Sequence, residues 1–309
     1  MLGAVSETVA RLVRWSGLAT IVRHTIARRR VSILLYHDPS PDVLDRHLAY
    51  LASRYNFVGL GDVVDALEPG RWSQLPSRAL VLTFDDGHRG NARLRDLFVR
   101  YGVRPTIYLC SQIIDTNRHY WFFECEDPEP LKVRSNDGRL AALQEVGFSP
   151  TKEYPEAQAL HAQEIDYLNE AVDFAVHSRF HPVLTACSDQ ECADEIVTSK
   201  VEVERVVGLP CLDFSYPNGD YGERELELVR KAGYRSARTV DLGWNKPGTD
   251  VFALKILGTS DTASVSRLAA DLTGVSGYLA RLKVGSLRGK HRSVATPSPE
   301  PNAAASSTQ

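Results

Sequence analysis

Cysteine is scarce in this sequence, and the few cysteines present form no recognisable structural pattern. They are five among 309 residues, an odd number without a close CxxC pair: Cys110, Cys125, Cys187, Cys192 and Cys211. This number and spacing argue against a disulfide framework and against a zinc knuckle. We therefore expect a protein of a reducing compartment.

A large excess of charge and a long apolar run are absent as well. The formal net charge is −3, so charge does not indicate a nucleic-acid partner. No uninterrupted apolar stretch approaches the ~20 residues of a transmembrane helix, and no signal peptide is recognised. We expect a cytoplasmic protein, with the inner membrane surface as a further location. A hydrophobic content of 43% and a charged content of 24% are ordinary for a soluble globular protein.

The first 30 residues combine positive charge with apolar residues. Six arginines stand against a single acid, Glu7, and apolar residues recur among them at roughly helical spacing. We expect a basic amphipathic helix over residues 1–30. Such a helix either lies on an anionic membrane surface or packs against its own domain.

A buried strand that runs into two carboxylates organises the rest of the chain. Residues 80–84 are apolar or β-branched, and Asp85, Asp86 and Gly87 follow directly. The carboxyl ends of strands are where α/β folds place their chemistry. One aspartate would then face a metal and the other a water; the alternative is a turn in which the aspartates cap the next helix.

Strands alternate with helices along the chain, which predicts an α/β fold with parallel strand pairing. Strands are expected at 31–37, 56–58, 80–84, 104–110, 172–176, 212–216 and 234–240. Residues 42–68 are expected to be helical around the short strand, with a new helix starting at Gly61-Asp62, and further helices are expected at 94–101, 189–207, 222–232 and 262–280. The domain then spans 31–284, and the Ser-, Pro- and Ala-rich residues 285–309 are expected to form a disordered tail.

An insertion at 112–170 interrupts this alternation. It separates two strands by far more than the usual connection of ~2–6 residues, and it contains aromatic and acidic residues and an Asn136-Asp137-Gly138 turn signal. Such an insertion either shapes a substrate groove or is a helical excursion without a role in binding.

Two histidines follow the strand at 172–176. His177 and His181 are four residues apart, and Pro182 disfavours a helix there, so we expect a loop in which the two rings converge. With one carboxylate from the Asp85-Asp86 pair, they form a sufficient ligand set for Zn²⁺ or a similar divalent ion. Such an ion polarises a carbonyl and lowers the pKa of a water towards ~7, and the second carboxylate is placed to take the proton.

These motifs resemble those of the polysaccharide deacetylases of carbohydrate esterase family 4. Thr-Phe-Asp-Asp-Gly, His-Ser-x-x-His and a Pro-x-Gly turn occur in that order, and Leu-Leu-Tyr-His at 34–37 resembles the exopolysaccharide branch. The resemblance implies a distorted (β/α) barrel of about seven strands, here preceded by the amphipathic helix. It implies that Asp85 is the general base, that Asp86, His177 and His181 bind the metal, and that the Asn218 backbone N–H stabilises the oxyanion. Zn²⁺ is the first expectation, with Co²⁺, Ni²⁺ or Mn²⁺ as alternatives.

The chain also departs from the family pattern. Ser215 stands where the third motif usually begins with an arginine that orients the base, and Asp241 and Trp244 are only loose candidates for the fourth motif. No histidine occurs between His181 and His291, so the usual late-barrel general acid is missing. His37 and His88 stand at predicted strand ends and are candidate substitutes, with a packing or hydrogen-bonding role as the alternative for each.

Together these features predict a metal-dependent hydrolase that removes N-acetyl groups from a glycan or glycan precursor. An O-acetyl ester is the less favoured target. A carbohydrate is the expected partner, such as a lipid-linked sugar on the cytoplasmic face, and the oligomeric state is left open. The alternatives are a hydrolase of another small amide on the same scaffold and a glycan-binding protein that has lost catalysis. Retention of both aspartates and both histidines favours an enzyme, because a binding protein has no need of the base.

Overall fold

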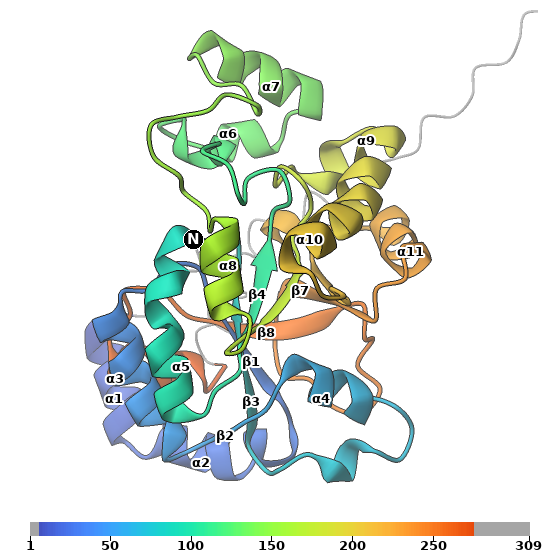
Figure 1. Ribbon diagram of the computed structural model, residues 1–309. Coiled ribbons are helices and arrows are strands. Elements are labelled where there is room, and N and C mark those ends of the chain that lie inside the picture. The colour runs from blue at the N-terminus through green and yellow to red at the C-terminus, as the bar shows by residue number, and fades with distance from the viewer. Residues whose placement is uncertain (1–5, 275–309) are drawn as a thin grey trace, which may run out of the picture.

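Seven parallel strands close into a barrel, and an eighth short strand lies outside it. The computed structural model describes residues 6–274 (Figure 1). The strands are β1 Ser32–Tyr36, β2 Asn56–Phe57, β3 Ala79–Phe84, β4 Thr106–Leu109, β5 Asp173–Val176, β6 Asp213–Ser215, β7 Ser236–Leu242 and β8 Leu254–Gly258. They are ordered β1-β8-β7-β6-β5-β4-β3, and pairing of β1 with β3 closes the ring, while β2 pairs with the first two residues of β3. The expected (β/α) barrel is confirmed.

The strands of this barrel are not all the expected ones. The segment 56–58 was expected to contribute a strand, but β2 has only two residues and is not part of the ring. Its place is taken by β8, which the sequence pattern did not predict. The strand β8 is short, contains exposed Lys255 and ends in Gly258, so its apolar pattern is weak.

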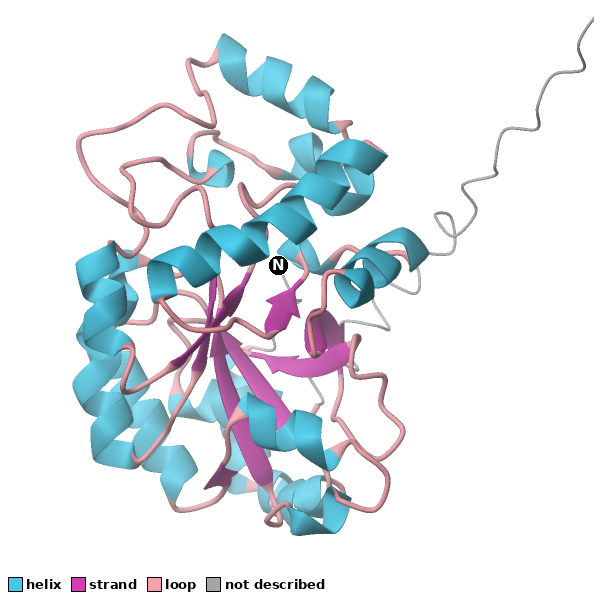
Figure 2. Cartoon of the chain, turned by 45° about the vertical axis from the view of Figure 1, so that its right-hand side comes forward, coloured by secondary structure: helices cyan, strands magenta, loops and turns pink. Residues whose placement is uncertain are grey.

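Helices surround the barrel (Figure 2). The α-helices are α1 Glu7–Trp15, α2 Leu18–His24, α3 Pro41–Ala52, α4 Leu60–Ala66, α5 Arg95–Tyr101, α6 Glu129–Lys132, α7 Asn136–Glu145, α8 Ala162–Leu168, α9 Asp189–Ala193, α10 Ser199–Val207, α11 Glu223–Lys231 and α12 Val265–Asp271. Short 3₁₀ turns are η1 Ala27–Arg29, η2 Trp72–Gln74, η3 Arg89–Leu94, η4 Trp121–Phe123, η5 Leu184–Ala186 and η7 Pro217–Gly219. A π turn, η6 Asp194–Thr198, joins α9 to α10, so the helix expected at 189–207 is continuous but locally widened.

Two local expectations need correction. The N-terminal segment is not one helix: Gly17, with φ of +83°, separates α1 from α2. The helical region expected over 42–68 is α3 and α4 with β2 between them, in agreement with the strand expected at 56–58 and the helix start expected at Gly61-Asp62. Asn136-Asp137-Gly138 is not a turn but the first turn of α7, because the side chain of Ser135 caps the helix by accepting a hydrogen bond from the Gly138 N–H.

The insertion is smaller than expected. Its last helix, α8, is the ordinary connection between β4 and β5 on the barrel wall, whereas α6 and α7 rise above one end of the barrel (Figure 1). These two helices enclose a small core of their own around Trp121, Leu143 and Phe148. Because the strands are parallel, all their carboxyl ends meet at the end of the barrel that this insertion covers.

The remaining expectations concern the two ends of the chain. The helix α1 packs on α12 through Ala10, Val13 and Ala270, so the N-terminal segment is attached to the domain. Within residues 6–274 no helix combines the length and apolarity needed to cross a bilayer. The tail expected at 285–309 lies outside the described residues.

Candidate active site

The turn after β3 presents Asp85 and Asp86 at the open end of the barrel. The Asp85 N–H donates to the Tyr36 carbonyl at 2.9 Å, which ties the end of β3 to the end of β1. Asp86 and Gly87 both have positive φ, at +70° and +66°. A Cβ on Gly87 would lie 2.4 Å from Leu109 Cδ2, so only glycine fits this turn. The turn therefore points the two carboxylates in different directions instead of capping a helix.

The loop after β5 brings His177 and His181 to the same place. Ser178 and His181 both have positive φ, and the Ser178 Oγ accepts from the His181 N–H at 3.1 Å. Glu195 accepts from the N–H groups of Arg179 and Phe180 at 2.7 and 3.0 Å, which fixes the middle of the loop. The expected loop, as opposed to a helix, is confirmed.

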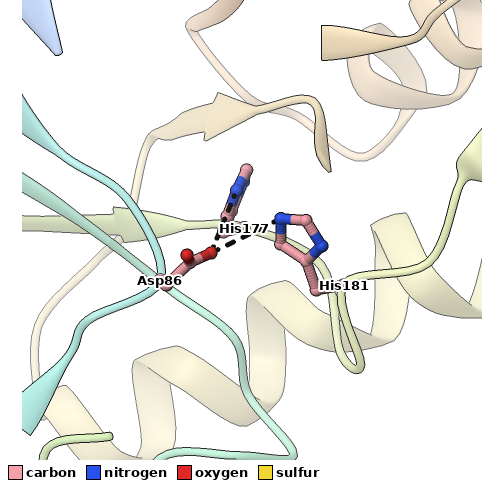
Figure 3. Close-up of side chains that lie close together, drawn as sticks. All are labelled: Asp86, His177 and His181. Atoms are coloured by element: carbon pink, nitrogen blue, oxygen red, sulfur yellow. Dashed lines mark ion pairs between the residues drawn. The ribbon is translucent and has the colours of Figure 1, made fainter. Parts of the chain in front are cut away.

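Asp86, His177 and His181 converge on one point (Figure 3). His177 Nε2 lies 3.6 Å and His181 Nε2 lies 3.4 Å from the same oxygen, Asp86 Oδ1. One ligand atom from each of the three residues falls within 4.8 Å of the others, and all three residues are buried. The three side chains predicted as metal ligands therefore do come together.

The chemistry of these donors fits a divalent cation. His177 Nδ1 lies 2.7 Å from the Ser215 carbonyl, which can only accept, so Nδ1 carries the proton and Nε2 keeps its lone pair toward Asp86. Asp86 Oδ1 is buried and accepts no hydrogen bond from any described residue. A buried carboxylate oxygen without a donor, facing two imidazole nitrogens, is the arrangement that a Zn²⁺-like ion satisfies.

The protonation states agree with this donor set. Burial lowers the pKa of His181 to about 4, so the ring is neutral near pH 7 and able to bind a metal. Burial alone would raise the pKa of Asp86, but the neighbouring His181, and after it His88 and His177, hold that pKa well below its ordinary value. The carboxylate is therefore ionised.

His88 contacts the other oxygen of the same carboxylate. Its Nε2 lies 3.2 Å from Asp86 Oδ2, and its side chain is buried. Burial would lower the pKa of His88, but the hydrogen bond to Asp86 raises it above the ordinary value. His88 thus fixes the carboxylate so that Oδ1 is left for the ligand position.

Asp85 is held by an arginine that the sequence analysis missed. Arg238 on β7 donates to both Asp85 oxygens and, at 2.6 Å, to the Ser215 Oγ. Arg238 is fully buried, and its guanidinium lies 5.1 Å from the centre of the Tyr108 ring. No local signal marks it, because β7 reads Ser-Ala-Arg-Thr-Val-Asp-Leu and Arg238 is one of several polar residues in that strand.

Comparison with known proteins identifies the family. The polysaccharide deacetylase sequence profile matches residues 73–237, which is more than half of the chain and contains the aspartate pair, both histidines and Ser215. The chain belongs to the polysaccharide deacetylase family. A comparison with curated proteins finds no match.

Solved structures of deacetylases share the barrel. A Streptococcus pyogenes deacetylase, PplD, solved in complex with acetate, aligns with a TM-score of 0.59 at 18% identity over 79% of this chain and 98% of that one. IcaB from Ammonifex degensii aligns with a TM-score of 0.57 at 16% identity over 79% of this chain and 97% of that one. A de-N-acetylase from Aggregatibacter actinomycetemcomitans gives 0.57 at 15% identity, over 78% and 99% of the two chains. At these identities the structures show a common fold.

The remaining family candidates lie in different surroundings. Asn218 is in η7, with φ of +58°, directly after β6. His37 is half exposed at the end of β1, with its Nδ1 3.9 Å from Asp261 Oδ2. Trp244 lies against Arg30, two residues before β1, and Asp241 is exposed and accepts from Tyr221. The family's fourth motif is therefore not matched by Trp244, which is at the opposite end of the barrel from Asp85.

Aromatic residues of the insertion cover the deacetylase site. The Tyr120 hydroxyl donates to the Asp86 carbonyl, and Trp121 Nε1 donates to the His181 carbonyl at 2.8 Å. The Phe122 ring lies 4.9 Å from the His181 ring, and Phe123, which is 56% exposed, lies 5.9 Å from His88. The insertion is thus part of the site wall and not a detached excursion.

Proposed function

We propose that this family member is a metal-dependent hydrolase that removes N-acetyl groups from a glycan or glycan precursor. The observation that carries the proposal is the convergence of Asp86, His177 and His181 on one point, with Asp85 beside them. Membership of the polysaccharide deacetylase family implies deacetylase activity on a carbohydrate. The dependence on a metal and the specificity for N-acetyl groups are our additions to what family membership implies.

The two aspartates have separate tasks in this proposal. A divalent cation held by Asp86, His177 and His181 would polarise the acetyl carbonyl and acidify a water. Asp85 lies 3.8 Å from His177 Nε2, close enough to accept the proton of a water bound beside that centre. Arg238 fixes the orientation of the Asp85 carboxylate, and the Asn218 N–H is the donor that we assign to the developing oxyanion.

Two observations favour an N-acetylated sugar. A structural neighbour from Aggregatibacter actinomycetemcomitans is named a de-N-acetylase, and we extend that linkage to this chain. Phe123 exposes an aromatic face next to His88, and an aromatic ring suits the apolar face of a sugar. A glycan-binding protein without catalysis would not need Asp85 to be held by a buried arginine, because that arrangement costs desolvation and serves only a charged base.

Metal analysis together with acetate release tests the proposal. We expect about one divalent ion per purified chain, acetate release from N-acetylated but much less from O-acetylated oligosaccharides, and loss of release with a chelator. Asp85→Asn should keep the metal and lose most activity, whereas Asp241→Asn, an exposed acid, serves as the matched control. A chain that binds N-acetylated glycans but releases no acetate with any of Zn²⁺, Co²⁺, Ni²⁺ or Mn²⁺ would identify a glycan-binding protein. Acetate release that is equal in Asp85→Asn would remove that residue as the base.

A further inference from the structure

The two N-terminal helices bury their small residues and expose their large ones. The buried positions are Ala10 and Val13 on α1 and Ala19 and Val22 on α2. In contrast, Leu12 is 64%, Trp15 is 77% and Ile21 is 59% exposed. Folding stabilises a protein by removing apolar area from water, so packing on the barrel does not account for these large side chains.

This exposure is concentrated in one short segment. Sixteen large apolar side chains are exposed within residues 6–274, and six of them lie between positions 9 and 26: Val9, Leu12, Trp15, Leu18, Ile21 and Ile26. The other ten are spread from position 99 to position 240. Scattered single apolar residues are normal on a protein surface, but a cluster of this kind marks a contact surface.

Positive charge lies next to this cluster. His24, Arg28, Arg29, Arg30 and Lys246 line a shallow basin that also includes Ile26, and none of its described lining residues is acidic. Neither Arg28 nor Arg29 forms an ion pair with a described acidic side chain, and both are exposed. Residues 1–30 carry six arginines and one acid, although the whole chain has a net charge of −3. The rest of the protein is therefore net acidic, and the positive charge is local.

We propose that this surface, made of Leu12, Trp15, Leu18, Ile21 and Ile26 with Arg28 and Arg29, docks the protein on an anionic phospholipid bilayer. Lipid phosphates match the arginines of the basin, and the acyl boundary takes the aliphatic side chains. Trp15 suits the headgroup level because its ring is apolar and its N–H is polar. Charge complementarity selects a membrane over a second copy of this chain, since two such basic surfaces repel each other.

Docking in this way determines whether the active site faces the membrane or the water. The turn η1 ends only three residues before β1 begins, so the basic basin lies at the amino end of the barrel. Asp86, His177 and His181 lie at the carboxyl end, under α6 and α7, and Figure 1 shows α2 at the opposite end of the molecule. The strand β3, which leads to Asp85, is six residues long, or about 20 Å at ~3.3 Å per residue. The site would then face the aqueous side and take its glycan from there, not a short lipid-linked sugar of the same bilayer.

Vesicle co-sedimentation tests this surface with the full chain. We expect binding to vesicles of phosphatidylcholine and phosphatidylglycerol, little binding to pure phosphatidylcholine, and weaker binding at high salt. Each of Arg28→Gln and Arg29→Gln should weaken binding roughly fivefold, because a surface arginine contributes about 1 kcal/mol on an anionic membrane. Trp15→Ser should also weaken binding. Acetate release from a soluble glycan should be unchanged in all three variants, which shows that each is folded.

Matched substitutions elsewhere separate this surface from general charge and apolarity. Arg205→Gln and Val133→Ser change an exposed arginine and an exposed valine far from the basin and should bind like the wild type. The proposal is overturned if anionic vesicles do not bind the protein, or if the controls and the surface variants weaken binding equally. It is also overturned if Trp15→Ser dissociates a stable dimer while vesicle binding is unchanged, because the occupant would then be a second copy of this chain.

Discussion

The guanidinium of Arg238 donates hydrogen bonds to both carboxylate oxygens of Asp85. The arginine is on β7, directly opposite Ser215 of β6 in the strand register, and it also donates to the Ser215 hydroxyl. Ser215 occupies the position at which the family's third motif usually has its arginine. The neighbouring strand β7 therefore supplies the positive charge that position 215 on β6 lacks. Arg238 holds the Asp85 carboxylate from β7, where the family's usual arginine would hold it from β6.

Arg238→Lys should slow catalysis without removing the metal. An ammonium keeps the charge but cannot reproduce the fixed geometry of a guanidinium that spans two carboxylate oxygens and a hydroxyl. We expect kcat to fall about 10²-fold, the cost of misplacing a reacting group by about 1 Å, with KM and metal content nearly unchanged. Acetate-release kinetics and metal analysis measure both. The control is Arg235→Lys, which affects a half-exposed ion pair with Asp65. Wild-type kcat in Arg238→Lys would show that the orientation of Asp85 does not depend on this contact.

Arg238→Ala should lower the stability of the folded protein. It leaves the Asp85 carboxylate buried without its cation, and breaking a buried pair in this way costs about 3–5 kcal/mol. Asp85→Asn in the same background should recover part of that loss, because it removes the unpaired charge. Chemical unfolding of Arg238→Ala, of Asp85→Asn and of the double variant measures the free energy of unfolding of each. Equal instability of the single and double variants would mean that packing of the arginine, not its charge, stabilises the barrel.

His181→Ala should abolish metal retention and leave the barrel folded. The ring supplies one of the three converging donors, and its loss leaves Asp86 and His177, which are too few to hold the ion through purification. The metal content should fall from about one ion per chain to a trace, with an unchanged circular dichroism spectrum. His119→Ala is a suitable control, because that histidine stacks on Tyr154 in the insertion, away from the three donors. Stoichiometric metal in His181→Ala would show that the ligand assignment is wrong.

The convergence of the site was predictable because it follows from strand polarity. Residues 80–84 and 172–176 are mainly apolar, with Thr83 and Asp173 as their polar members, and any two parallel strands in one barrel bring the residues after them to the same end. The loop geometry of His177 and His181 followed from Pro182. The sequence pattern therefore predicted which side chains come together, namely those that directly follow the strands.

The parts that escaped prediction depend on contacts between distant segments. Arg238 was missed because its partner Asp85 lies 153 residues earlier, and no local pattern encodes that pair. The strand β8 was missed because an exposed lysine and a terminal glycine weaken a five-residue signal. Gly17 splits the N-terminal segment into two helices although the apolar spacing continues across it. In each case tertiary structure or a single backbone conformation decided the outcome.

The two candidate proton donors, His37 and His88, should respond differently to substitution. His88 contacts Asp86 Oδ2, so His88→Ala should weaken metal binding as well as slow the reaction. The His37 side chain pairs with Asp261 and not with Asp86, so His37→Ala should leave the metal in place. A general acid acts in its protonated form, and its loss removes the fall in kcat/KM on the alkaline side of the pH profile.

The measurement is therefore a pH profile at saturating metal for both variants. General acid catalysis is typically worth ~10²–10⁴-fold, so a change of that size together with loss of the alkaline limb would identify the donor. The control is His161→Ala, a partly exposed histidine near Asp115. Unchanged profiles in both His37→Ala and His88→Ala would mean that neither histidine is the acid.

Glu195 should make the stability of the histidine loop depend on pH. Burial raises its pKa above the ordinary value for glutamate, although the Phe180 and Arg179 N–H groups oppose the shift. A raised pKa means that the folded protein binds this proton more tightly than the unfolded chain does. The contribution of Glu195 to the free energy of unfolding is thus present at low pH and is lost as pH rises through the folded-state pKa.

Glu195→Gln should remove that dependence and keep the loop in place. The amide oxygen can accept from both N–H groups while carrying no charge, so the variant should lose less stability than the wild type between acidic and neutral pH, with metal content preserved. Glu195→Ala, in contrast, leaves the two partly buried N–H donors of Arg179 and Phe180 unpaired and should both destabilise the protein and lower its metal affinity. Urea unfolding across this pH range measures the first effect, and Glu145→Gln, on the exposed end of α7, is the control. If Glu195→Gln and the wild type lose stability in parallel as pH rises, the carboxylate is not the group that titrates, and its hydrogen bonds alone hold the loop.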